Sequence, residues 1–213
     1  MKMTLLEALA IDAEKTSTIA VVGGGGKTSL IFRLMESFVS IGKKVIVTTT
    51  THMAYEPERP FVEDGDIDGV RKNLQRYHYT VAASLDRATE KIGCLSEEKL
   101  EELRGLADVL LIEADGAKRL SLKVPGEREP VIPEFAEMVI GVVGVDALGE
   151  PIQKTCHRPE KVADFLGKGM EEVVTEDDIV KIAVSAEALR KCVDGREYCV
   201  LLNKADIRGK AEA

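Results

Sequence analysis

The chain has 213 residues, of which 45% are hydrophobic and 31% are charged, a composition typical of one soluble domain with a substantial core. Its formal charge of −8, from 37 acidic and 29 basic residues, argues against a nucleic-acid-binding surface, which would need a basic stripe. The apolar stretches are too short to span a membrane, and the N-terminus does not resemble a signal peptide. We therefore expect a cytoplasmic protein that binds neither nucleic acid nor membranes.

The first expected strand, residues 18–22, runs into a glycine-rich loop. A strand that breaks into glycines before a helix directs backbone N–H groups at a phosphate, and a lysine after the glycines adds a positive charge. A following threonine hydroxyl is a ligand for Mg²⁺. The segment therefore predicts a binding loop for a nucleoside triphosphate, with the lysine also acting in catalysis. Its residues are Gly23, Gly24, Gly25, Gly26, Lys27, Thr28 and Ser29.

This loop is shorter than the common pattern G-x-x-x-x-G-K-[ST], because Val21 stands where that pattern has its first glycine. The remaining G-x-x-G-K-[ST] resembles the shortened loops of the ATP-dependent Mur ligases. A dinucleotide fingerprint, G-x-G-x-x-G, is the competing interpretation, but Thr28 does not complete it. That fingerprint also needs an acidic residue about 20 positions further on, where residues 48–51 are all threonine. The triphosphate interpretation is therefore favoured.

Apolar, β-rich runs alternate with helical patterns along the chain. After the glycines, Leu30, Leu34 and Phe38 recur every four residues, as in a helix that packs on a sheet. Further helices are expected from Ser96 and from Thr175 to about Cys192, and a long loop is expected over residues 123–133. The expected strands are residues 18–22, 44–49, 79–83, 108–113, 138–145 and 197–202. This order predicts a single three-layer α/β domain over residues 1–213, with a mainly parallel sheet of the P-loop NTPase type and ligands at the carboxyl ends of its strands.

The second expected strand ends in four threonines followed by His52. Thr49 is a candidate Mg²⁺ or γ-phosphate contact, and His52 is a candidate for positioning water. The threonines are equally consistent with a strand that simply continues, since threonine favours β-structure. Both interpretations stay open.

The fourth expected strand ends in a cluster of acidic residues. Four apolar residues precede Glu113, and Asp115 and Gly116 follow it, as in a Walker B strand whose acid holds Mg²⁺ or orients water beside the γ-phosphate. Either acid fits that role, and Glu113-x-x-Gly116 also resembles the E-x-x-G switch of some GTPases and ATPases, whose glycine N–H contacts the γ-phosphate. Lys118 and Arg119 come next, either as a solvated pair or as cations for a phosphate or an anionic substrate.

The last expected strand is followed by Asn203, Lys204 and Asp206. This N-K-x-D order is the signature of guanine recognition, in which the aspartate accepts hydrogen bonds from the base and the lysine stem covers it. Adenine lacks the matching donors, so the motif favours GTP over ATP. The chain stops seven residues later, which allows for a missing C-terminal portion.

Taken together, these motifs resemble the YqeC family. The resemblance rests on residues 22–28, 48–52, 113–119 with Pro125 and residues 129–133, 144–149 with 157–160, and 203–206. It implies a P-loop NTPase-like protein that is an accessory factor of selenium-dependent molybdenum hydroxylases, with such an enzyme or its cofactor-maturation proteins as partners. It also adds Asp146, His157 and Arg158 to Lys118 and Arg119 as candidate substrate-binding residues.

The leading hypothesis is a Mg²⁺-dependent nucleoside triphosphatase, with GTP favoured over ATP, that serves the maturation of such a hydroxylase. An alternative is a kinase or ligase that activates a small anionic acceptor. A third is a binding module that is switched by nucleotide without turnover. Turnover measurements separate the three hypotheses. Phosphate release without an acceptor favours the triphosphatase, release only with an acceptor favours the kinase or ligase, and tight binding without release favours the binding module.

Overall fold

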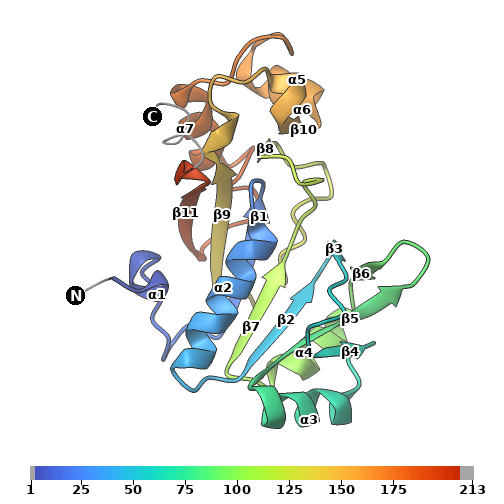
Figure 1. Ribbon diagram of the computed structural model, residues 1–213. Coiled ribbons are helices and arrows are strands. Elements are labelled where there is room, and N and C mark those ends of the chain that lie inside the picture. The colour runs from blue at the N-terminus through green and yellow to red at the C-terminus, as the bar shows by residue number, and fades with distance from the viewer. Residues whose placement is uncertain (1–2, 207–213) are drawn as a thin grey trace. The chain divides into compact units, whose positions relative to one another are not determined.

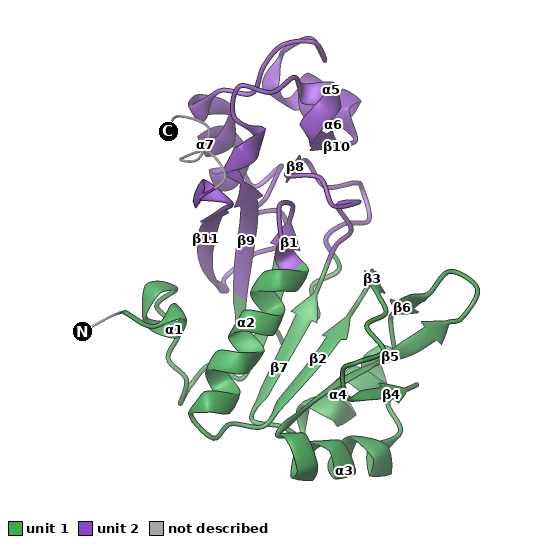
Figure 2. Cartoon of the chain, in the orientation of Figure 1, with its two compact units in different colours: residues 1–21, 28–114, 131–138 green, residues 22–27, 115–130, 139–213 purple. Residues whose placement is uncertain are grey.

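The structure is a computed structural model that describes residues 3–206 (Figure 1). The chain divides into two compact units, which are coloured separately in Figure 2. Unit 1 consists of residues 1–21, 28–114 and 131–138, and unit 2 consists of residues 22–27, 115–130 and 139–213. The single domain expected from the sequence stays a prediction.

Unit 1 is built around parallel strands in the order β1-β7-β2-β5. Their bounds are β1 Thr18–Gly23, β7 Val109–Glu113, β2 Val45–Thr49 and β5 Tyr79–Asp86. Every residue of β1, β2 and β7 is buried, which explains why these strands read as continuous apolar runs. The register places Glu113, at the end of β7, opposite both Val21 and Thr49. Strand ends that carry polar side chains therefore meet at one edge of the sheet.

The sheet of unit 1 continues through short strands beyond β5. The parallel strand β4 (Phe61–Glu63) pairs with β5, and the antiparallel β6 (Lys91–Gly93) joins β5 to β3 (His52–Ala54). The sequence did not predict these strands, because three residues are too few to show an alternating pattern. The sheet is consequently mixed rather than purely parallel.

Helices cover both faces of this sheet, which gives the expected three layers (Figure 1). Helix α2 (Lys27–Ser40) follows the glycine loop on one side, while α3 (Ile67–Tyr77) packs on β5 and α4 (Glu97–Arg104) on β7. The side chain of Ser96 accepts a hydrogen bond from the Lys99 N–H, so it caps α4 as the sequence predicts. The short α1 (Leu5–Ala8) precedes β1.

Unit 2 contains β9 (Met138–Gly144) between β11 (Glu197–Asn203) and the end of β1. A small parallel pair joins β8 (Leu122–Lys123) to β10 (Cys156–His157). The remaining elements are η1 (Val145–Ala147), α5 (Ile152–Thr155), α6 (Pro159–Leu166) and α7 (Glu176–Val184). Residues 124–137 hold no helix or strand, which confirms the expected long loop.

Helix α7 begins where the sequence predicts but ends earlier. Thr175 and Asp178 form the capping box at its start. The helix stops at Val184 because Ser185 is extended and its hydroxyl accepts the Glu187 N–H, which begins a turn instead of another helical turn. The expectation that it runs to about Cys192 was therefore wrong. Over residues 3–206, no helix is long and apolar enough to cross a membrane.

Candidate functional site

Gly23 and Gly25 of the glycine loop, in unit 2, stand where a residue with a side chain would not fit. Gly23 has φ +98° and Gly25 has φ +78°, both in the left-handed region. A Cβ atom would lie 2.3 Å from the Val142 carbonyl oxygen at the first position and 2.3 Å from the Gly144 nitrogen at the second. The run of glycines therefore reflects backbone conformation and close packing against β9.

The loop N–H groups are bonded to protein acceptors in this structure. Gly24 N–H donates to the Val142 carbonyl and Gly25 N–H to the Leu120 carbonyl, each over 2.9 Å. Gly23 N–H donates to the carboxylate of Asp115, at 3.0 and 3.1 Å from its two oxygens. The role of the loop in phosphate binding stays a prediction, and in the structure a carboxylate holds one of its donors.

Lys27, which ends the loop, is almost completely buried. Its ammonium group donates to the Gly23 carbonyl over 2.7 Å and lies 3.1 Å from Asp115 Oδ1. The side chain of Asp115 is only 2% exposed. Asp115 therefore interacts with the two kinds of donor, a loop N–H and the Lys27 ammonium, that the sequence assigns to a phosphate.

A chain of charged side chains leads from the buried Asp115 and Lys123 to the partly exposed Glu129 and Arg158. Lys123 Nζ lies 3.0 Å from Asp115 Oδ2 and 2.8 Å from Glu129 Oε2, and it also donates to the Gly116 carbonyl over 2.6 Å. Arg158 binds Glu129 through both terminal nitrogens, at 2.6 and 3.0 Å. Burial alone would raise the pKa of Glu129, but the hydrogen bonds from Arg158 and Lys123 outweigh it and lower the pKa to about 2.

Sequence analysis missed Lys123 and Glu129 as parts of this network. A signal for Lys123 was its place between Leu122 and Val124, since a lysine flanked by apolar residues is buried only when it is paired. Arg158 was expected to contact a substrate, whereas here its guanidinium is engaged by Glu129.

The other candidate substrate residues of unit 2 differ in exposure. His157 is buried in β10, and burial, together with the nearby positive charge of Arg158, lowers its pKa. Lys118 and Arg119 are exposed, and both have positive φ angles, of 47° and 63°. Among the residues that the structure describes, neither side chain makes a hydrogen bond or ion pair, so both remain available for an anionic ligand.

The N-K-x-D segment contacts the glycine loop. Asn203 Nδ2 donates to the Gly25 carbonyl over 2.8 Å. Lys204 Nζ lies 2.8 Å from Asp146 Oδ2 and 2.9 Å from Ser121 Oγ. Asp206 is exposed. The structure thus brings together Asn203 with the loop and Lys204 with Asp146, while the role of all these residues in guanine recognition stays a prediction.

Unit 1 contributes the hydroxyl and carboxylate that the sequence assigns to Mg²⁺. Thr28 Oγ1 donates to Glu113 Oε2 over 2.8 Å, and the Glu113 side chain is buried. Thr49 Oγ1 donates instead to the Glu113 carbonyl over 2.9 Å. His52 is exposed at the start of β3, where it is paired with Gly93.

Mg²⁺ fits the pair formed by Thr28 and Glu113. Both provide oxygen atoms, and Mg²⁺ commonly takes one or two protein ligands and completes its shell with water and phosphate oxygens. Over residues 3–206, the structure has no cluster of three or more His, Cys, Asp or Glu side chains that would hold a metal by themselves.

Comparisons with known proteins agree with the motifs. A family model described as YqeC protein matches residues 19–160. A protein of Escherichia coli (strain K12), described as uncharacterized protein YqeC, is 35% identical over 188 residues, which make up 82% of this chain and 72% of that protein. Among solved structures, the MinC:MinD cell division protein complex of Aquifex aeolicus matches with a TM-score of 0.35 and 17% identity, over 91% of this chain and 84% of that chain. This structural similarity is too low to support an argument.

Proposed function

Starting from a chain that belongs to the YqeC family, we propose that it is a Mg²⁺-dependent nucleoside triphosphatase that prefers GTP to ATP. The observation that carries the proposal is the hydrogen bond of 2.8 Å from Thr28 Oγ1 to Glu113 Oε2. It joins the residue after the loop lysine to the acid at the end of β7, which is the pair expected at the metal of a P-loop enzyme.

The proposed chemistry relies on charge and position. Thr28 and Glu113 would hold Mg²⁺, which neutralises charge on the β- and γ-phosphates. Lys27 would stabilise the negative charge on the transferred phosphoryl group, with the loop N–H groups beside it in the chain. Glu113 or Asp115 would orient the attacking water, and the Gly116 N–H would contact the γ-phosphate.

Binding of a triphosphate would first require Lys27 to leave Asp115. The two groups are 3.1 Å apart, and the Asp115 carboxylate also accepts the Gly23 N–H, so a phosphate would replace a carboxylate at the same donors. Lys123 remains 3.0 Å from Asp115, and it would keep the displaced carboxylate neutralised. Asp115 therefore occupies the donors that the proposal assigns to the triphosphate.

The preference for GTP is supported by residues 203–206, which begin with the last residue of β11. Asn203 is bonded to the Gly25 carbonyl, which ties this segment to the phosphate loop. Asp206 is exposed and is the residue assigned to the guanine N1 and N2 protons. Lys204, bound to Asp146, would have to release that contact in order to cover the base.

The cellular role follows from the family resemblance. We assign the protein to the cytoplasm, as an accessory factor in the maturation of a selenium-dependent molybdenum hydroxylase, with that enzyme or its cofactor-maturation proteins as partners. The accessory role is tested separately from hydrolysis by co-purification. We expect the chain to co-purify with the hydroxylase in the presence of GTP, and the Lys27→Ala variant to lose this association.

The biochemical proposal is tested by calorimetric titration with GTP and ATP, with and without Mg²⁺, followed by phosphate-release measurements. We expect Mg²⁺-dependent binding that Lys27→Ala abolishes, and release of phosphate from GTP. An unchanged nucleotide affinity in Lys27→Ala would contradict the assignment of the glycine loop as a phosphate-binding loop. Tight binding without release would favour a nucleotide-switched binding module, and release only with an acceptor would favour a kinase or ligase.

A further inference from the structure

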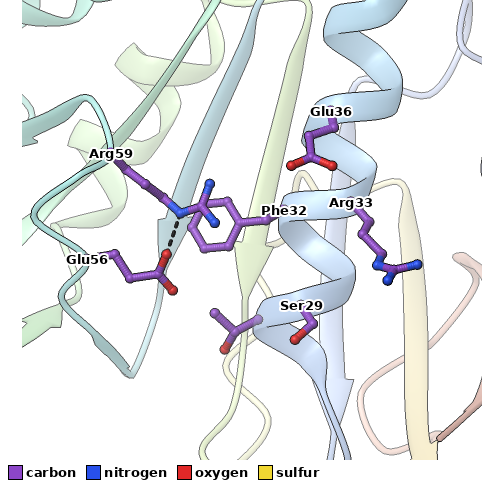
Figure 3. Close-up of a pocket in the computed structure, with 7 residues that line it drawn as sticks. Ser29, Phe32, Arg33, Glu36, Glu56 and Arg59 are labelled. Carbon is purple, nitrogen blue, oxygen red and sulfur yellow. Dashed lines mark hydrogen bonds and ion pairs between the residues drawn. The ribbon is translucent and has the colours of Figure 1, made fainter.

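A pocket of about 380 Å³ opens on unit 1 beside the start of helix α2. Its residues come from one side of α2 and from the loop between β3 and β4 (Figure 3). They are Thr28, Ser29, Phe32, Arg33, Glu36, Glu56 and Arg59. Most of this surface is polar, so a ligand there would be held by hydrogen bonds and charge rather than by apolar contact.

The Arg59 guanidinium is held in place inside this pocket. Its central carbon lies 3.5 Å from the centroid of the Phe32 ring, and its Nε is bonded to Glu56 (Figure 3). The Phe32 side chain is buried and gives the guanidinium a fixed platform. Within residues 3–206, the two terminal nitrogens of Arg59 have no hydrogen-bond partner. These two nitrogens, which together can bind a carboxylate, are thus held in position without a partner among the described residues.

An unpaired negative charge lies in the same pocket. Glu36 is one helical turn after Phe32 on α2, and its carboxylate makes no hydrogen bond or ion pair with any residue that the structure describes, Arg59 included. Arg33, by contrast, points away from the Phe32 ring (Figure 3). The pocket therefore offers the two terminal nitrogens of a guanidinium that Glu56 pairs through Nε, and a separate carboxylate, Glu36, that is not paired with it.

We propose that this pocket binds a small amino acid or hydroxy acid. The carboxylate of the ligand would accept two hydrogen bonds from Arg59, and its ammonium or hydroxyl group would donate to Glu36. Thr28 and Ser29 form the end of the pocket nearest the glycine loop in the chain, so the ligand would act as an effector of the nucleotide reaction. This last role rests on the proposed function, whereas the binding itself does not.

The test is an NMR titration of the full ¹⁵N-labelled chain with L-serine, read from the arginine Nε–Hε signals. We expect saturable shifts of the Arg59 signal, and affinity at least about tenfold weaker in Arg59→Lys, which keeps the charge but loses the fork. Arg71→Ala, which removes an exposed arginine of α3 in the same unit, is the matched control and should bind normally. Thermal unfolding of each variant shows that the fold is retained.

Two further arms make the outcome decisive. Glu36→Gln should weaken binding of L-serine but leave binding of acetate unchanged, because acetate has no donor for Glu36. Lys27→Ala should lose nucleotide binding and keep L-serine binding, which separates failure of this proposal from failure of the proposed function. Equal L-serine affinity in Arg59→Lys and Arg71→Ala, or the absence of any shift at Arg59, would overturn the assignment.

Discussion

The ammonium group of Lys123 lies 3.0 Å from the carboxylate of Asp115, and their side chains are 0% and 2% exposed. A buried ion pair gains little over apolar packing, but removing one partner leaves an uncompensated charge in the interior. Asp115 also meets Lys27, and Lys123 also meets Glu129. Stability of unit 2 and the state of the glycine loop therefore depend on the same carboxylate.

Lys123→Met should strongly destabilise the protein. It leaves Asp115 and Glu129 with one cation fewer, and loss of one partner of a buried pair costs about 3–5 kcal/mol. Urea unfolding followed by circular dichroism measures the change. Lys154→Met removes a lysine that is 69% exposed and paired with Glu150, so it should alter the free energy of unfolding by less than about 0.5 kcal/mol. Similar effects in the two variants would contradict the structural role of Lys123.

The interactions of Glu129 predict how stability depends on pH. Its pKa is about 2 in the folded protein and 4.5 in the reference state. Because the folded pKa is the lower one, these interactions contribute their full stability above about pH 4.5 and lose it as the pH falls toward 2.

Glu129→Gln should remove this part of the acid sensitivity. The measurement is the free energy of unfolding at pH 5 and at pH 3 in both proteins, where the variant should show the smaller loss. Glu150→Gln changes a more exposed acid, so its free energy of unfolding should depend on pH as that of the original protein does. An unchanged pH dependence in Glu129→Gln would show that other carboxylates dominate.

Asp206→Asn tests guanine recognition. An amide cannot accept from both guanine donors, so the affinity for GTP should fall by about tenfold, close to the loss of one charged hydrogen bond, while the affinity for ATP stays unchanged. Calorimetry with both nucleotides measures this ratio. Asp194→Asn, at an aspartate whose side chain is 77% exposed, is the control. An equal change for both nucleotides would mean that residues 203–206 form only a turn.

The sequence predicted the features that depend on local pattern. Each of the long strands was found within a few residues of its expected bounds. The signal is clearest for β1, β2, β7 and β9, which are apolar runs buried along their whole length. The sequence assigned Thr28 to Mg²⁺ together with Glu113 or Asp115, and the structure joins Thr28 to Glu113 by a hydrogen bond, while metal binding stays a prediction. The strand ends are where sequence and structure agree best.

Features that depend on contacts between distant residues were not predicted. Lys123 belongs to a two-residue strand that was expected to begin a loop, and only its pairing with β10 and Asp115 shows that it is buried. The stacking of Arg59 on Phe32 joins a loop to a helix across 27 positions, and neither residue carries a motif. Periodicity cannot reveal such contacts, because they arise from tertiary packing.

Asp115→Asn separates the two roles of this residue. If Asp115 competes with phosphate for Lys27 and the Gly23 N–H, the amide should compete less well, and the affinity for GTP should rise severalfold. If Asp115 also orients the attacking water, the rate of phosphate release should fall at the same time.

In this variant we therefore expect calorimetry to show a higher affinity for GTP and the phosphate-release assay to show a lower rate. Asp164→Asn is the matched comparison, since it changes an exposed aspartate of α6 at a different point of unit 2. It should leave Lys27 in place and should not raise the affinity for GTP by the same route. Weaker GTP binding in Asp115→Asn, with the fold intact by circular dichroism, would show that Asp115 supports the phosphate loop instead of closing it.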